Sequence, residues 1–101
     1  MAIDDLSVPS LQVRVRVPGE VLTRQVGDEM VMLHLDRESY YGLDPVGARV
    51  MQLAESGATL EQIAGRLLEE FDADREQVEG DLRRLAAELI AAGLLEQDAA
   101  R

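Results

Sequence analysis

The hydrophobic period of this chain changes once, and that change fixes the order of its secondary structure. Up to Leu43 the apolar residues alternate with polar ones, or form short runs between turn signals, as they do in strands. From Asp44 onward they recur at intervals of three and four residues, as in amphipathic helices. The sequence therefore predicts an α+β domain in which a small antiparallel sheet comes first and helices follow.

Four segments in the first part of the chain have the pattern of a strand. "LQVRVRV" at residues 11–17 alternates strictly and predicts a half-buried strand, and residues 21–26 and 39–43 predict two more. "EMVMLHL" at residues 29–35 is almost entirely apolar, which predicts a strand buried on both faces. The expected sheet has three strands, or four if residues 11–17 join it.

Three helices are expected, and residues at their ends mark each of them. A capping residue precedes every apolar stripe, and a glycine follows the first and the third. These signals are carried by Asp44, Pro45, Gly57, Thr59, Gln62, Asp74, Gln77 and Gly93. Because a lone sheet of this size needs helices over one face, the predicted arrangement resembles a winged helix-turn-helix whose sheet comes first.

Length and composition limit the chain to one domain of a simple kind. A chain of 101 residues is too short for two cores, so we expect one domain at residues 11–96, a flexible lead-in at 1–10 and a tail at 97–101. The absence of cysteine excludes disulfides and thiolate zinc sites. No apolar run approaches the roughly 20 residues of a membrane span. We therefore expect a cytoplasmic protein that does not contact membranes.

Charge and motif content argue against nucleic-acid binding and catalysis. A winged-helix DNA-binding regulator, which the element order leaves open, needs a basic recognition helix, whereas the net charge here is −10. The only histidine, His34, lies in the most apolar strand and has no thiol partner, which predicts a structural role. No phosphate-binding loop or metal motif is found, so we expect no enzyme activity and no cofactor or metal site.

The tyrosine pair in residues 39–43 suggests a binding surface. Tyr40 and Tyr41 are neighbours, so they point to opposite faces of a strand. As the last strand of the sheet, this segment has one free edge, which can accept an extended peptide while a nearby helix supplies a pocket. The adjacent Arg83 and Arg84 suggest surface ion pairs with nearby acids, or a contact with an acidic segment of a partner.

An ordered set of residues in the chain is similar to a known family. This set of residues comprises Tyr40-Tyr41, Leu43-Asp44, Gly47, Gly57, Thr59, Ile63-Ala64, Val78, Asp81-Leu82 and Gly93-Leu94-Leu95. Residues 21–96 thereby resemble the PqqD family, the peptide-recognition domains of pathways that modify ribosomally made peptides. The resemblance implies three strands followed by three helices, no chemistry of its own, and binding of a precursor leader peptide as an added strand.

The resemblance also implies a site and partners. The leader would lie in a groove between the last strand and the third helix, lined by Ser39, Tyr40, Tyr41, Gly42 and Leu43 and by Asp81, Arg84, Leu85 and Glu88. "YYGLDPVGARV" resembles most the stand-alone members from lasso-peptide gene clusters, which implies a leader-cleaving cysteine protease as the second partner. The redox-cofactor (PQQ) branch implies a radical SAM enzyme instead.

The regular strand at residues 11–17 departs from the family pattern. It would be an added strand, or an arm that swaps between two copies, so the chain is expected to be a monomer or a swapped dimer.

Overall fold

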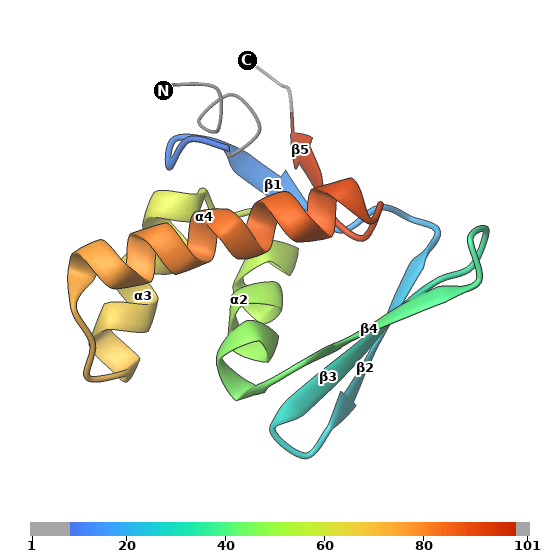
Figure 1. Cartoon of the computed structure of the whole chain (residues 1–101), viewed down its shortest axis with the longest axis horizontal. Helices are drawn as coiled ribbons and strands as arrows, with labels where there is room; N and C mark the ends of the chain where they lie inside the picture. The colour runs from blue at the N-terminus through green and yellow to red at the C-terminus, as the bar shows by residue number, and fades with distance from the viewer. Residues whose placement is uncertain (1–8, 99–101) are drawn as a thin grey trace.

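The computed structural model of the chain describes residues 9–98 and places a three-stranded sheet beside three helices (Figure 1). The strands are β2 (Val21–Val26), β3 (Glu29–His34) and β4 (Ser39–Leu43), and the helices are α2 (Pro45–Glu55), α3 (Leu60–Glu70) and α4 (Arg75–Ala91). The sheet is antiparallel with the order β2-β3-β4. This arrangement confirms the expected α+β fold of the winged helix-turn-helix type.

The segment at residues 11–17 does not join this sheet. Only Arg14–Arg16 forms a strand, β1, and it pairs antiparallel with β5 (Glu96–Asp98) near the other end of the chain. Val15 is buried, whereas the arginines on either side of it are exposed, as the alternation predicts. β5 includes Gln97 and Asp98 from the expected tail, while residues 1–8 of the lead-in and 99–101 of the tail lie outside the described residues.

The N-terminal segment also completes the start of α3. The N–H of Leu60 donates to the carbonyl of Val13 at 3.0 Å, and the N–H of Glu61 donates to the carbonyl of Leu11 at 2.8 Å. The first N–H groups of a helix have no partner within the helix. The N-terminal segment supplies acceptors for two of them, so the residues just before β1 are hydrogen-bonded to the start of α3.

The core lies between one face of the sheet and the helices. On β3, Met30, Met32 and His34 point into it, whereas Val31 and Leu33 remain 37% and 38% exposed. The expectation that this strand is buried on both faces is therefore wrong. Among the described residues the helices cover only one face of the sheet, so the second apolar face of β3 has no covering layer (Figure 1).

His34 has the structural role expected of it. It is buried, and its Nδ1 accepts a hydrogen bond from the main-chain N–H of Arg37 at 3.2 Å. This bond holds the turn between β3 and β4.

The helix ends match the expected capping residues. Asp44 Oδ1 accepts the N–H of Gly47 at 2.8 Å, and Asp74 Oδ2 accepts the N–H of Gln77 at 3.3 Å. Thr59 forms a reciprocal capping box at the start of α3. After α4, Gly93 has a φ of +79°, and this left-handed conformation ends the helix. The N-cap of α2 places that helix directly after β4.

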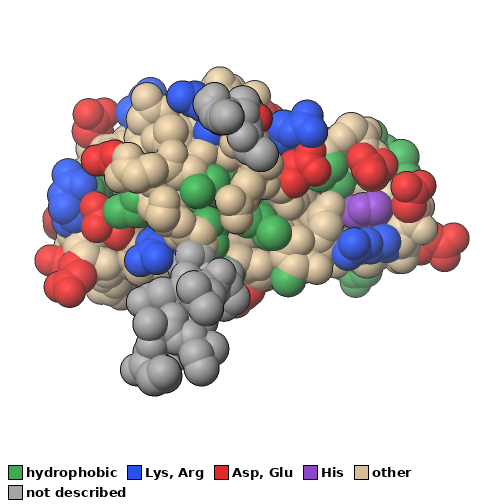
Figure 2. Space-filling model, turned by 90° about the horizontal axis from the view of Figure 1, so that it is seen from above, with side chains coloured by type: hydrophobic (Ala, Val, Ile, Leu, Met, Phe, Trp, Pro, Cys, Tyr) green, Lys and Arg blue, Asp and Glu red, His purple; other side chains and the backbone are tan. Residues whose placement is uncertain are grey.

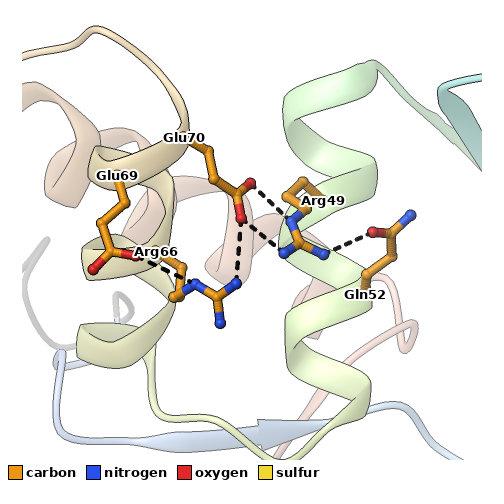
Figure 3. Close-up of polar contacts among 5 residues, drawn as sticks. All are labelled: Arg49, Gln52, Arg66, Glu69 and Glu70. Carbon is orange, nitrogen blue, oxygen red and sulfur yellow. Dashed lines mark hydrogen bonds and ion pairs between the residues drawn. The ribbon is translucent and has the colours of Figure 1, made fainter.

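A cluster of ion pairs joins α2 to α3 (Figure 3). Arg49 binds Glu70 with two hydrogen bonds, Nε to Oε1 at 2.8 Å and Nη2 to Oε2 at 2.7 Å. Arg66 lies 3.6 Å from both Glu69 and Glu70. The hydrogen bond from Arg49, together with the charges of Arg49 and Arg66, lowers the pKa of Glu70. Because the contact is bidentate, with two parallel N–H···O bonds, this pair is the most specific polar contact between the two helices.

Glu70→Gln is expected to make the fold less sensitive to acid. Because the pKa of Glu70 is lower in the folded chain than its ordinary value of 4.5, the pair stabilises the fold fully above that value. The stabilisation is lost as the pH falls through the lowered pKa. Urea unfolding from pH 7 to pH 3 should show the stability difference between wild type and variant shrinking toward low pH. Glu69→Gln, whose side chain is 73% exposed, is the control, and an equal effect there would contradict the assignment.

Candidate functional site

β4 is an edge strand whose free side carries the main-chain groups of Tyr40 and Gly42. The N–H of Leu35 donates to the carbonyl of Glu20, so Leu35 and every second residue before it on β3 turn their main chain toward β2. The residues between them bond to β4, where their partners are Ser39, Tyr41 and Leu43. The main-chain N–H and C=O groups of Tyr40 and Gly42 therefore point away from β3, and no described strand pairs with them.

The two tyrosines lie on opposite faces, as predicted. The O–H of Tyr41 donates to Glu88 Oε1 on α4 at 2.8 Å. This hydrogen bond, with burial and the negative charge of Glu88, raises the pKa of Tyr41. Tyr40 is 76% exposed on the other face. Tyr41 is therefore the tyrosine that links the edge strand to α4.

A groove runs from the free edge of β4 toward the start of α4. Its first part, about 560 Å³, is lined by Tyr41, Gly42, Leu43, Val46, Asp81 and Leu85, among others. Its second part, about 550 Å³, shares Val46, Asp81 and Leu85, and its further apolar walls include Val50, Phe71 and Val78. The two hollows share these residues and are therefore neighbours; together we call them the β4–α4 groove. Its walls offer apolar side chains beside free main-chain hydrogen-bonding groups.

The structure gathers most, but not all, of the site residues expected from the sequence. Tyr41, Gly42, Leu43, Asp81 and Leu85 line the groove, and Glu88 meets it through Tyr41. Arg84 is ion-paired with Asp81 beside it. Ser39 pairs with His34 at the far end of the strand, and Tyr40 points outward.

Sequence reasoning missed the residues that α2 and the end of α3 contribute to the groove. Val46, Val50 and Phe71 carry the spacing of core residues. Val50 is indeed buried in the core, whereas Val46 is 44% and Phe71 37% exposed. No sequence signal separates them from the core stripe, because the helix packing decides which of them meets the cavity.

Charge and side-chain chemistry restrict what the site can do. On the face seen in Figure 2, acidic and basic side chains are interspersed and form no basic patch. The adjacent basic residues are also divided, because Arg83 Nε donates to the Pro9 carbonyl at 2.8 Å while Arg84 meets Asp81. Within residues 9–98 no cluster of three or more His, Asp or Glu side chains could hold a metal ion. No helix in the described part of the chain could cross a membrane.

A free strand edge beside a helix-lined apolar groove defines the chain as a small α+β binding domain. The chain belongs to the PqqD family, because the family model described as Coenzyme PQQ synthesis protein D (PqqD) matches residues 29–95. Members of this family are non-catalytic binding modules, which confirms that the chain is not an enzyme. No curated protein shows a significant match.

Solved structures share this fold over most of the chain. TbiB1 in complex with the TbiA(beta) leader peptide is 38% identical, with a TM-score of 0.78, over 84% of this chain and 99% of that one. The PqqD truncation of Methylobacterium extorquens PqqCD, described as a stand-alone RiPP recognition element, is 27% identical, with a TM-score of 0.74, over 89% and 96%. A lasso peptide synthetase B1 with its leader peptide, 24% identical over 81% and 96% with a TM-score of 0.74, shows the same fold.

Proposed function

We propose that this chain captures the leader of a ribosomally made precursor peptide and presents it to a leader-cleaving cysteine protease of a lasso-type pathway. The observation that carries the proposal is the free main chain of Tyr40 and Gly42, which lies beside the apolar β4–α4 groove. The 38% identity to TbiB1, whose structure holds a leader peptide, supports leader binding. The lasso assignment rests on the resemblance of "YYGLDPVGARV" to the stand-alone members.

A leader added to β4 would meet two different kinds of surface. Alternate side chains of a strand point to opposite faces, so every second leader residue would enter the groove toward Val46 and Leu85. Main-chain hydrogen bonds contribute only about 0.5–1.5 kcal/mol each. Apolar burial of about 25 cal/mol per Å² must supply much of the affinity. The groove therefore selects leaders with apolar residues at alternate positions.

The α4 wall sets the charge of the site. Asp81 is ion-paired with Arg84, and Glu88 holds the hydroxyl of Tyr41. With a net charge of −10 on the chain, an acidic leader segment would be repelled unless it met Arg84. Exchanging Asp81 or Arg84 would alter the helix side of the groove that we propose for the leader.

A second candidate is a carrier of the leader for a radical SAM enzyme in redox-cofactor (PQQ) synthesis. The family description and the 27% identity to the Methylobacterium extorquens domain favour it. We rank it second because "YYGLDPVGARV" resembles the stand-alone members from lasso-peptide gene clusters most. The two candidates share the groove and differ in the enzyme that receives the leader.

Titration of a labelled leader tests the shared part of both candidates. The leader of the precursor encoded beside this chain, followed by fluorescence anisotropy, is expected to bind saturably and to keep its affinity when the core peptide is deleted. A leader of scrambled sequence is the control. No saturable binding at micromolar concentrations would overturn the proposed function. Adding the neighbouring cysteine protease or radical SAM enzyme to the complex then separates the two pathways.

A further inference from the structure

The face of the sheet opposite the core carries a row of exposed apolar side chains across all three strands. The register pairs Leu22 with Leu33 and Leu33 with Tyr40, and their side chains are 53%, 38% and 76% exposed. In the next row Val31 lies between Arg24 and Gly42. We call Leu22, Arg24, Val31, Leu33 and Tyr40 the outer-face patch.

The outer-face patch belongs neither to the core nor to the β4–α4 groove. The core uses the other side of β3, through Met30 and Met32, and the groove uses Tyr41. A shallow hollow of about 300 Å³ lies within the patch, lined by Leu22, Thr23, Arg24, Val31 and Leu33. Contiguous exposed apolar residues on a small domain mark an interaction surface. The apolar run of β3 thus supplies two surfaces, one for folding and one for contact.

The one charged residue of the patch, Arg24 on the edge strand β2, indicates what kind of partner fits it. The side chain of Arg24 has no hydrogen-bond or ion-pair partner between residues 9 and 98, whereas Arg49 and Arg84 are both paired with acids. Glu29 lies on the same face of the sheet, yet no ion pair joins it to Arg24. A surface of apolar side chains around a carboxylate would complement the patch. A second copy is disfavoured, because each copy carries a net charge of −10.

We propose that the outer-face patch is the docking surface of the leader-cleaving enzyme, an inference that rests on the proposed function. β4 contributes Tyr41 to the groove and Tyr40 to the patch, so one strand belongs to both sites. A leader added to the free edge of β4 would place its alternate side chains on the outer face, next to Tyr40 and Gly42. An enzyme docked there contacts the carrier and the peptide together, and its carboxylate meets Arg24.

Charge reversal at two arginines tests the docking surface. The probe is the purified cysteine protease of the same gene cluster, whose binding to the immobilised, leader-saturated chain is measured by biolayer interferometry. Arg24→Glu and Leu33→Ser are expected to weaken this binding by about tenfold or more. Arg66→Glu makes the same charge change on α3 and should leave the binding near wild type. Equal weakening by Arg24→Glu and Arg66→Glu would reveal only long-range charge and overturn the proposal, as would unchanged binding of Arg24→Glu.

A measurement of leader binding distinguishes failure of the docking surface from failure of the proposed function. Both outer-face variants are expected to bind the labelled leader as wild type does, since neither residue lines the groove. If the leader binds but protease binding is unchanged in both outer-face variants, the docking surface is refuted and the proposed function stands. If the wild type binds no leader, both fail. Light scattering that gives a mass of two chains, returned to one by Leu33→Ser, would assign the patch to a second copy and overturn the proposal.

Discussion

Gly42→Pro is expected to weaken leader binding by about tenfold or more while leaving the fold intact. The N–H of Gly42 faces the free edge of β4, and proline has no N–H to donate. A leader carbonyl left without its donor costs about 1–3 kcal/mol, and 1.4 kcal/mol corresponds to roughly tenfold in affinity. Proline is tolerated on an edge strand when its nitrogen faces outward, and the preceding Tyr41 already has the extended conformation that proline requires.

Gly42→Ala is the matched control for this experiment. An added Cβ at Gly42 meets no atom within 4 Å, and alanine keeps the N–H. Anisotropy titrations should therefore separate the two variants, while urea unfolding should not. Equal weakening by alanine would show that the lack of a side chain at position 42, rather than its N–H donor, is what leader binding requires. A large loss of stability in Gly42→Pro alone would mean that this N–H pairs with β3 and that the edge assignment is wrong.

Val15→Asp is expected to destabilise the fold by at least about 3 kcal/mol, because an unpaired carboxylate would be buried. Val15 is 1% exposed in β1, within the core cluster, although the family model begins only at residue 29. Since a domain of this size is stable by roughly 5–15 kcal/mol, such a loss is easily measured by urea unfolding with circular dichroism.

Val26→Asp provides the same substitution at an exposed site. Val26 is 56% exposed at the end of β2, so its replacement should cost no more than about 1 kcal/mol. If both variants lose the same stability, β1 is not part of the folding core and the domain is limited to the family region. If only Val15→Asp is affected, the N-terminal strand is a structural element that this chain needs.

Local signals predicted the helices well because those signals act over a few residues. Asp44, Thr59 and Asp74 cap the helices through N–H groups only three residues away, so the sequence contains both partners of each bond. The opposite orientation of Tyr40 and Tyr41 followed from the two-residue period of a strand in the same way.

Features that depend on distant contacts could not be predicted. The pairing of Arg14 with Asp98 joins opposite ends of the sequence, and no local pattern names the partner of a strand. Val31 and Leu33 suggested a second buried face, because apolar content alone does not tell whether a layer covers it. The positions of Val46 and Phe71 along the groove depend on how α2, α3 and α4 pack.

The pairing of β1 with β5 has a consequence for how such a domain can be joined to other proteins. Because Arg14 lies opposite Asp98, the first and last strands of the described chain are neighbours (Figure 1). Neither strand lines the β4–α4 groove or the outer-face patch. A domain whose first and last strands are paired can be appended to either end of an enzyme, or inserted into one of its surface loops, while the groove and the outer-face patch stay uncovered.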